Sequence, residues 1–500
     1  MNLRMSIHHI VALSLLAVLT LSTVSAQDLA DSVYDFTLDN GLRVIMVDQE
    51  FAPTISFNLM FDVGGVDEPP GLGGIAHMVE HMAFKGTRSI GSKDPVRELE
   101  LLAEVELNVN TLAEARENGA SEEELAELEQ ALNEAQERAL ELQDVNYLER
   151  LMDQNGAVGL NASTGYDRTS YVVSLPNNRL ELYARIYADI LLDPVFRSFY
   201  EEADVVREER RQRSEDDPRG ALFEVFLREA FKVHPYGRPL IGDPEEIAAY
   251  RTEIALDFFD TFYQPNRAVL VLAGDVEPER DLAIIENFFG ALPEGSETHI
   301  DIPSEPLQSS ERRVEFSFDA EPQVIAGYHK PTYPDRSAYV LDVASAILSS
   351  GRTSRIYKRM VVEERTALSA FTGSSFPGTR YPNLFIFYAL PRSPHTTTEL
   401  EEAFYQEVER LQTDLVDERE LEKVKNQVRA GFIRSLASSS GLASQIAFYE
   451  LFLGGWENLV SYESIIETVT AEEVREAARR YLVPENRTVA TLISEGSEDQ

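Results

Sequence analysis

The sequence His77-Met78-Val79-Glu80-His81 combines residue types and a spacing that suit metal chemistry. On a helix, residues four apart project from one face, so both imidazoles could hold a single ion. Glu80, three residues after His77, would lie beside them, where it could take a proton from a water activated by zinc. The order of residues is the inverted form of a common zinc-protease motif. The alternative interpretation is two ordinary histidines on a helix.

A zinc site also needs a third protein ligand and an open position for water. The candidates are the carboxylates of the acidic segment 200–213. Glu202 and Glu209 are seven residues apart and share a face with Val205 and Val206, which we expect to point to the interior. We therefore predict that Glu209 is the third ligand and that Glu202 supports the site. Taken alone, an acidic helix of this kind is more often a solvated surface.

The elements that must position these residues follow from hydrophobic patterns. Residues 34–47 alternate around Asn40-Gly41, which predicts a β-hairpin. The motif itself should lie on a helix. We expect a strand over 54–63, the motif helix over 73–84, β-structure over 161–176, helices over 179–213 and a buried strand over 268–273.

Residues 95–149 differ from the rest of the chain in composition and periodicity. Apolar residues recur at alternating spacings of three and four, first over 102–112 and again over 125–142. Ser121, followed three residues later by Glu124, is a capping box that opens the second helix. This pattern predicts an inserted antiparallel helical hairpin with an acidic, solvated surface.

A short internal similarity indicates that the chain repeats one unit. The sequence YQPNR at 263–267 precedes one apolar run, and VPENR at 483–487 precedes another, 220 residues further on. We therefore predict an α+β fold of two homologous α/β-sandwich halves, each an antiparallel sheet covered by helices. The predicted boundaries are 27–292 for the first half with its inserted hairpin, 293–310 for a linker, and 311–500 for a degenerate second half.

Five segments carry a resemblance to a known family. They are GGIAHMVEHMAFKGT (73–87), NASTGYDRTSYVVSLP (161–176), EEADVVREERRQR (201–213), HPYGRPLIG (234–242) and FYQPNRAVLVLAGDV (262–276). Together they resemble the pitrilysin/insulinase family of zinc metallopeptidases, peptidase family M16. The match is closest to the short branch, which includes mitochondrial processing peptidases and bacterial periplasmic relatives. The resemblance implies that the two halves enclose a chamber.

The resemblance also implies roles for individual residues. His77, His81 and Glu209 match the family's zinc ligands, so the implied cofactor is one Zn²⁺ per chain. Glu80 matches the catalytic general base, and Glu202 matches the supporting carboxylate of the catalytic site.

Asn161 and Ala162 match the edge strand along which a peptide substrate lies as an added strand.

Two departures from the family pattern stand out. The 127 residues between His81 and Glu209 exceed the gap in simpler members, and the predicted hairpin accounts for most of the excess. Val362 and Ser369 stand where active family sites have an Arg and a Tyr from a partner half or subunit. The resemblance therefore implies a second, M16-like subunit, in a hetero- or homodimer, that supplies the pair.

Composition excludes several other classes of function. The chain has 45 Lys and Arg against 86 Asp and Glu, a formal net charge of −41. Such a charge argues against nucleic acid and against an anionic membrane face as partners. The absence of Cys excludes disulfides, thiolate metal sites and a Cys nucleophile.

Residues 1–26 have the features of a cleaved export signal. Arg4 is followed by an apolar run over 10–24, and Val24-Ser25-Ala26 is a small-residue cleavage pattern. The run is shorter than the ~20 residues of a membrane-spanning helix, although an uncleaved anchor is the alternative. We expect an exported protein, periplasmic or secreted, without a membrane span after cleavage.

These observations predict a zinc metalloendopeptidase that acts on peptides or unfolded polypeptides. Two alternatives differ in class. One is a catalytically weak subunit that binds peptides or scaffolds a partner, and the other is a non-proteolytic metallohydrolase. Zinc and peptidase assays would separate them.

Overall fold

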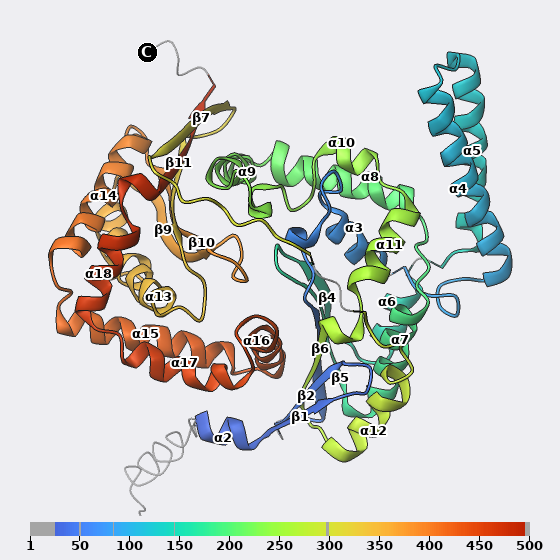
Figure 1. The fold of residues 1–500 in the computed structure, drawn as a ribbon, viewed down its shortest axis with the longest axis horizontal. Helices are drawn as coiled ribbons and strands as arrows, with labels where there is room; N and C mark the ends of the chain where they lie inside the picture. The colour runs from blue at the N-terminus through green and yellow to red at the C-terminus, as the bar shows by residue number, and fades with distance from the viewer. Residues whose placement is uncertain (1–25, 50–51, 84, 145, 297–299, 496–500) are drawn as a thin grey trace, which may run out of the picture.

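The structure is a computed structural model that describes residues 26–49, 52–83, 85–144, 146–296 and 300–495. Two β-sheets with their helices form two halves that lie side by side (Figure 1). The predicted signal segment, apart from its last residue, lies outside the described residues, and so does Phe84 at the end of the predicted motif helix.

The first sheet has six strands in the order β1-β2-β6-β3-β5-β4. β1 and β2 form the hairpin predicted around Asn40-Gly41, where Gly41 has a φ of +90° that favours glycine. β4, which begins the predicted β-structure, lies at one end of the order. The strands are β1 Val33–Thr37, β2 Arg43–Asp48, β3 Thr54–Phe61, β4 Val158–Thr164, β5 Thr169–Pro176 and β6 Ala268–Gly274.

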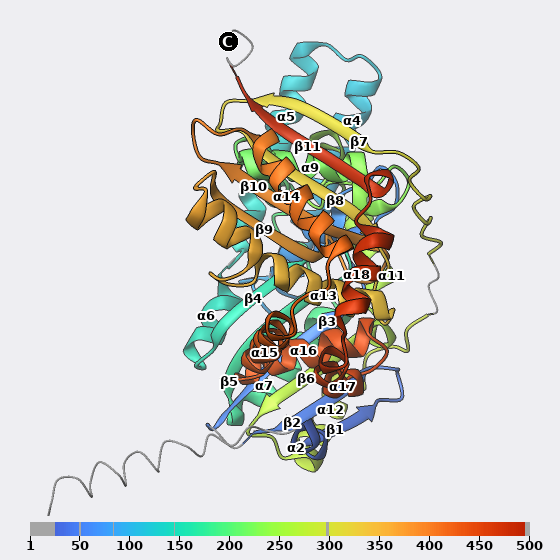
Figure 2. The ribbon, with the colours of Figure 1, turned by 90° about the vertical axis from the view of Figure 1, so that its left-hand side faces the viewer.

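The second sheet has five strands in the order β7-β11-β8-β10-β9. Figure 2 shows it with the helices α13, α14 and α18 of the second half lying over it. The strands are β7 Arg312–Phe318, β8 Gln323–Lys330, β9 Ala367–Phe376, β10 Asn383–Pro391 and β11 Arg487–Ser494.

The two sheets repeat one topology. β6 lies between a parallel partner, β2, and an antiparallel partner, β3; β11 lies in the same way between β7 and β8. Both central strands follow a short 3₁₀ turn in the two similar sequences, Pro265–Arg267 and Pro484–Asn486. The expected sheets are thus antiparallel except for one parallel pair in each, which arises because the last strand of each half returns from a distant part of the chain.

Helices cover both faces of each sheet. The helices of the first half are α3 Ile75–Ala83, α4 Pro95–Glu117, α5 Glu122–Leu142, α6 Tyr147–Gln154, α7 Leu180–Leu192, α8 Phe199–Arg210, α9 Pro218–Ala230, α10 Pro244–Ala248, α11 Thr252–Phe262 and α12 Pro278–Phe289. The other helices are α2 Ala26–Asp31, α13 Arg336–Ser349, α14 Thr397–Thr413, α15 Glu418–Ser435, α16 Ser439–Phe452, α17 Glu457–Glu467 and α18 Ala471–Tyr481.

One helix of each half packs on the sheet of the other half. α9 lies against β7, β8 and β11, while α16 lies against β3 and β6. The contact of α9 is close, because a Cβ atom at Gly327 of β8 would lie 2.5 Å from the ring of Phe226. Since both faces of the central strands are covered, all seven residues of β6 are buried. The two halves therefore share their apolar cores.

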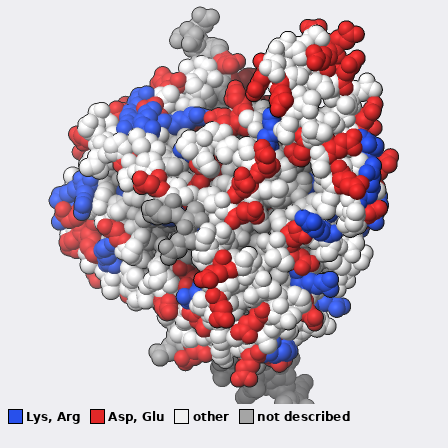
Figure 3. All heavy atoms as spheres, turned by 45° about the vertical axis from the view of Figure 1, so that its right-hand side comes forward, with Lys and Arg blue, Asp and Glu red and all other residues white. Residues whose placement is uncertain are grey.

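The helices α4 and α5 form the predicted antiparallel hairpin and project from the first half (Figure 1). Val105, Val109 and Ala135 form its buried seam, and Arg197 and Glu98 form a fully buried ion pair at its base. The hairpin helices end at Leu142, and the remainder of the predicted insertion begins a separate helix, α6. Figure 3 shows many acidic side chains on this face of the molecule, including the projecting hairpin.

Candidate metal centre

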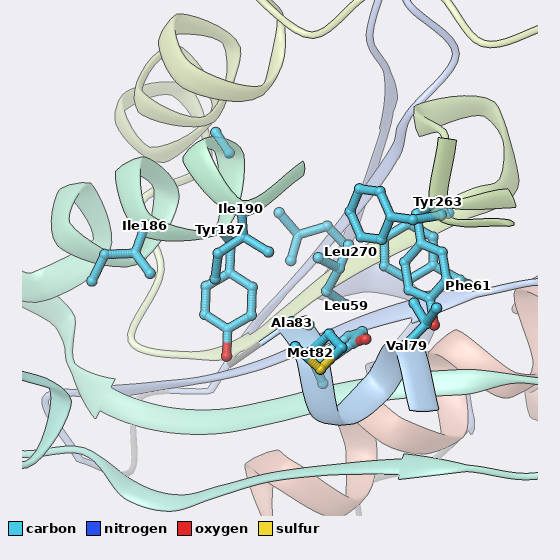
Figure 4. Packing of buried hydrophobic residues seen from close by; sticks show 14 of the residues in the cluster. Leu59, Phe61, Val79, Met82, Ala83, Ile186, Tyr187, Ile190, Tyr263 and Leu270 are labelled. Atoms are coloured by element: carbon cyan, nitrogen blue, oxygen red, sulfur yellow. The ribbon is translucent and has the colours of Figure 1, made fainter. Parts of the chain in front are cut away.

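Packing of the apolar side of α3 in the core determines where its polar side chains point. Val79, Met82 and Ala83 pack against Leu59 and Phe61 of β3 in the core of the first half (Figure 4). Residues three and four apart share a helix face. The polar residues His77, Glu80 and His81 occupy the other side of this short helix, so its core packing turns them toward α8 and β4.

The helix α8 supplies the carboxylates. Val206 is fully buried, and Glu202 and Glu209 face α3, as predicted. The prediction that Val205 also faces the interior was wrong, because Val205 is 52% exposed. One valine is enough to fix the helix face, since residues at 202, 206 and 209 are neighbours on successive turns.

The structure brings His77, His81 and Glu209 to one point. The two Nε2 atoms lie 3.3 Å apart, and Glu209 Oε2 lies 3.8 Å from His77 Nε2 and 3.5 Å from His81 Nε2. Among the described residues, this is the group of His, Asp and Glu side chains that could hold a metal ion. The donors come from two helices that are far apart in the sequence.

These donors fit zinc. Tetrahedral zinc with bonds of about 2.0–2.1 Å separates neighbouring ligand atoms by about 3.3 Å, close to the separations found here. Two imidazoles and one carboxylate are also a donor set of catalytic zinc sites, in which one further position stays open for water or substrate.

Further residues orient the donors. His81 Nδ1 lies 2.9 Å from Glu202 Oε1, and a proton donated there leaves the Nε2 lone pair facing the centre. Lys85 Nζ contacts the other oxygen of Glu202 at 2.5 Å. Arg213 contacts Glu209 Oε1 at 2.7 Å, which leaves Oε2 to face the histidines.

Burial and neighbouring charges also shift the pKa values of His77 and His81. Burial, together with the charges of His81 and Arg213, lowers the pKa of His77 to about 3, so this ring stays neutral as a ligand must. For His81, burial lowers the pKa, but the hydrogen bond and charge of Glu202 with the charges of Glu209 and Glu80 raise it overall. A metal ion at this point would compete with that proton.

Glu80 lies beside the donors and is held by the edge strand. Burial raises its pKa, although the hydrogen bond from Thr164 opposes the shift. Thr164 Oγ1 donates to Glu80 Oε2 at 2.7 Å. A carboxyl group with a raised pKa beside a metal site is suited to accept a proton from water near neutral pH.

Two cavities meet at this point. One, of about 490 Å³, is lined by His77, Glu80, Ala162 and Thr164 among others. The other, of about 550 Å³, is lined by Glu80, His81, Asn161 and Ala162 among others. Because Glu80 and Ala162 line both, the two cavities follow β4, and the predicted substrate residues lie beside the candidate metal centre.

The second half contributes unevenly to this region. Phe376, at the end of β9, lines the first cavity. Val362 and Ser369 line neither of the two cavities, and both are exposed on the second half. The chain therefore does not bring these two positions to its own centre.

Sequence reasoning missed four neighbours of the predicted residues: Lys85, Thr164, Arg213 and Phe376. Lys85, Thr164 and Arg213 lay inside segments that carried the family resemblance, but no spacing rule links them to partners many residues away. Phe376 had no sequence signal at all, because its place follows from the packing of one half on the other.

The chain belongs to the pitrilysin/insulinase family, peptidase family M16. The family model described as "Insulinase (Peptidase family M16)" matches residues 43–118 and 138–244. The model described as "Peptidase M16 inactive domain" matches residues 252–428. The gap in the first match, residues 119–137, covers the turn of the α4–α5 hairpin and most of α5.

Similar proteins extend over nearly the whole chain. The zinc protease PqqE of Helicobacter pylori is 25% identical over 97% of this chain and 99% of its own. The uncharacterized zinc protease YmxG of Bacillus subtilis is 21% identical over 92% of this chain and 98% of its own. These names support a peptidase of the zinc-dependent kind.

Solved structures share the fold. A protease from Helicobacter pylori has a TM-score of 0.77 at 24% identity and covers 92% of this chain and 99% of its own. The periplasmic protease PqqL of Escherichia coli has a TM-score of 0.66 at 18% identity and covers 93% of this chain and 48% of its own. In the part of the chain that the structure describes, every helix is too short or too polar to traverse a bilayer.

Proposed function

We propose that the chain is a zinc-dependent metalloendopeptidase that hydrolyses peptides or unfolded polypeptides in a chamber between its halves. One observation carries the proposal: His77, His81 and Glu209 converge on one point beside Glu80 and the edge strand β4. A peptidase needs these parts together, namely a metal, a base and a surface that aligns an extended chain.

Different residues of the chain would bind the metal, transfer the proton and orient a ligand. His77, His81 and Glu209 would hold the zinc ion, which supplies Lewis acidity that activates water and polarises a carbonyl group. Glu80 would accept the proton of the attacking water and later deliver it to the leaving amine. Glu202 would keep the His81 ring oriented through the bond to Nδ1.

The edge strand would align the substrate. β4 pairs with β5 on one side and borders both cavities on the way past the centre. An extended peptide that added to β4 at Asn161 and Ala162 would be held mainly by backbone hydrogen bonds, which tolerate many sequences. Unfolded substrates should therefore be cut, whereas stably folded domains should be spared.

We further propose that a second M16-like subunit completes the enzyme. Val362 and Ser369 stand where the resemblance implies an Arg and a Tyr, and neither lines the cavities at the centre. A homodimer would not restore the pair, so we favour a different chain as partner. The isolated chain should have low activity and be activated strongly by that partner; full activity of a strict monomer would contradict this proposal.

A catalytically weak, peptide-binding or scaffolding subunit is the second candidate function. The absence of the Arg and Tyr at 362 and 369 favours it, and one solved structure with this fold is described as a peptidase M16 inactive domain. The presence of Glu80 and of all three donors favours a catalytically active peptidase over a scaffolding subunit.

We propose that residues 1–26 are removed on export and that the mature protein is periplasmic or secreted. The structural relative PqqL is named a periplasmic protease, which supports the first of these locations. Within the mature chain we propose a zinc-bearing half over 27–292, a linker over 293–310 and a degenerate half over 311–500.

The test separates binding from chemistry. Glu80→Gln should keep the zinc and bind peptide but lose at least about a hundredfold in turnover, the usual size of a general-base effect. Turnover of an unfolded peptide should be measured with and without the partner, alongside zinc by elemental analysis. Unchanged hydrolysis by this variant would remove the role of Glu80, and wild-type protein that holds zinc but cuts no peptide with its partner would favour the scaffold.

A further inference from the structure

A loop of the second half is hydrogen-bonded to the turn that follows the proposed substrate-binding edge strand, β4. The loop, residues 377–382, joins β9 to β10 and reaches across to the turn that joins β4 to β5. Asp167 of that turn is 5% exposed and accepts hydrogen bonds from the backbone N–H groups of Thr379, at 2.5 Å, and Arg380, at 3.1 Å. Its other oxygen accepts from the Tyr236 hydroxyl at 2.5 Å.

Charge and close packing strengthen this junction. The Arg380 guanidinium lies 2.9 Å from Asp62 and 3.2 Å from Asp67, both from the first half. Gly378 leaves no room for a side chain, since a Cβ atom there would lie 2.4 Å from the Tyr236 hydroxyl and 2.5 Å from Asp167 Oδ2. The loop and the turn are therefore fitted to each other.

The turn 165–168 comes directly after Thr164, the residue that hydrogen-bonds Glu80. Thr164, three residues before Asp167, ends β4 and donates its hydroxyl hydrogen bond to Glu80. The turn between them is short and hydrogen-bonded: Gly165 N donates to Arg168 O at 2.8 Å, and Val66 N donates to Tyr166 O at 2.9 Å. Asp167 and Thr164 are therefore joined by a short turn whose backbone is fixed by hydrogen bonds at both ends.

We propose that residues 377–382 are a clamp by which the second half positions Glu80, with Asp167 and Thr164 as the positioning residues. The inference rests on the peptidase function proposed above and assigns to the second half a task that does not need the Arg and Tyr missing at 362 and 369. Displacement of the loop 377–382 would release the turn, so Glu80 would be correctly placed only while the loop holds Asp167.

The experiment compares four single variants and one double variant of the zinc-loaded full chain, in the subunit state that gives wild-type activity. Thr164→Val should lower kcat about tenfold with little change in KM, and Thr164→Ser should restore most of the loss. Asp167→Asn and Gly378→Ala should each lower kcat severalfold while zinc stays bound. The double variant Thr164→Val with Asp167→Asn should be no slower than Thr164→Val alone, because both changes act on one hydroxyl.

Glu407→Gln is the matched control. Glu407 of α14 is a buried carboxylate of the second half that accepts hydrogen bonds from Arg359 and Arg410, which lie outside the clamp and its neighbouring residues. It should reduce thermal stability but leave kcat within about twofold. Multiplying effects in the double variant, an unchanged kcat in Asp167→Asn, or an equal loss of kcat in Glu407→Gln would overturn the clamp.

Amide hydrogen exchange gives a readout that does not need activity. Asp167→Asn and Gly378→Ala should accelerate exchange in the turn 165–168 and the loop 377–382, and Glu407→Gln should not. If the wild type cuts no peptide, the peptidase function fails, and the clamp stands or falls on this measurement alone. Unchanged exchange in both loop variants would remove the clamp even if the enzyme is active.

Discussion

The second sheet repeats the arrangement of five of the six strands of the first sheet, yet among the described residues the candidate metal donors all lie in the first half. β6 and β11 have equivalent neighbours, and each follows the same kind of short turn. The helix α3, which follows β3, bears His77 and His81, whereas α13, which follows β8, contains no histidine. The architecture thus depends on apolar patterns that tolerate change, while the chemistry depends on a few polar residues.

Each of these two helices carries a carboxylate near the adjacent edge strand. Glu80 accepts one hydroxyl hydrogen bond, from Thr164 of β4. Asp342 accepts from Ser374 of β9 and also from Tyr333, at 2.6 Å. Burial raises the pKa of both carboxyl groups. Among the described residues, the group of possible metal donors lies beside Glu80, whereas Asp342 is a buried acid outside that group.

Metal content gives the largest expected difference between the halves. His77→Ala, His81→Ala and Glu209→Gln should each lose the single zinc ion, because the site has only three protein donors. Elemental analysis of the dialysed proteins measures this. Glu208→Gln, which changes an exposed neighbour paired with Arg211, is the matched control and should keep the metal.

Two other outcomes of the zinc measurement would contradict the ligand assignment. Full zinc in Glu209→Gln with loss in Glu208→Gln would move the ligand by one residue and contradict the helix face found here. Zinc that persists after His77 and His81 are both replaced would point to a site elsewhere in the chain.

The reciprocal helices give the next largest effect. Phe226 of α9 and Ile446 of α16 are fully buried against the sheet of the opposite half. Phe226→Ala should lower the free energy of unfolding by about 3–5 kcal/mol and Ile446→Ala by about 2–5 kcal/mol. Because each helix ties both halves together, urea unfolding followed by circular dichroism should remain a single transition in both variants.

Val205→Ala, at a half-exposed position on α8, is the control and should change the free energy of unfolding by less than about 0.5 kcal/mol. Two separate transitions, with each substitution affecting only one of them, would show that the halves fold independently and that the shared packing matters little.

The sequence was sufficient for the parts of the site that local geometry determines. The spacing in α3 places both histidines on one side, and Glu202 and Glu209 follow from the period of α8, although Val205 does not face inward. The two similar segments at 263–267 and 483–487 correctly indicated a repeated unit.

Contacts between distant segments could not be predicted in this way. Thr164 reaches Glu80 across 84 positions, and Asp167 meets Arg380 across 213. The packing of α9 and α16 on the opposite sheets also follows from three-dimensional shape, such as the space above Gly327, and not from any pattern along the chain.

Glu202→Gln should have an intermediate effect, because Glu202 acts on the metal only through His81. The amide cannot accept the Nδ1 proton as well as a carboxylate does, and it loses the contact with Lys85. Zinc affinity should fall about 10–100-fold, the usual cost of such a change. Competition with a zinc chelator measures it.

Glu201→Gln, one residue earlier on α8, is the matched control and should keep wild-type affinity. A loss of affinity in Glu201→Gln as large as in Glu202→Gln would show that the charge of the helix matters and not the bond to His81.

The hairpin should have the smallest effect, because it is an addition to one half that supplies no donor. Replacing residues 113–129 with a short Gly-Ser linker keeps the seam of Val105, Val109 and Ala135, and should change stability by less than about 1 kcal/mol and leave zinc binding unchanged. Removing 95–149 entirely should instead cost about 3–5 kcal/mol, since it leaves Arg197 buried without Glu98. Thermal unfolding and elemental analysis compare the two deletions. If the short deletion keeps the zinc but abolishes activation by the partner subunit, the hairpin contacts that subunit; if activation persists, it is an inert insertion whose base alone contributes to stability.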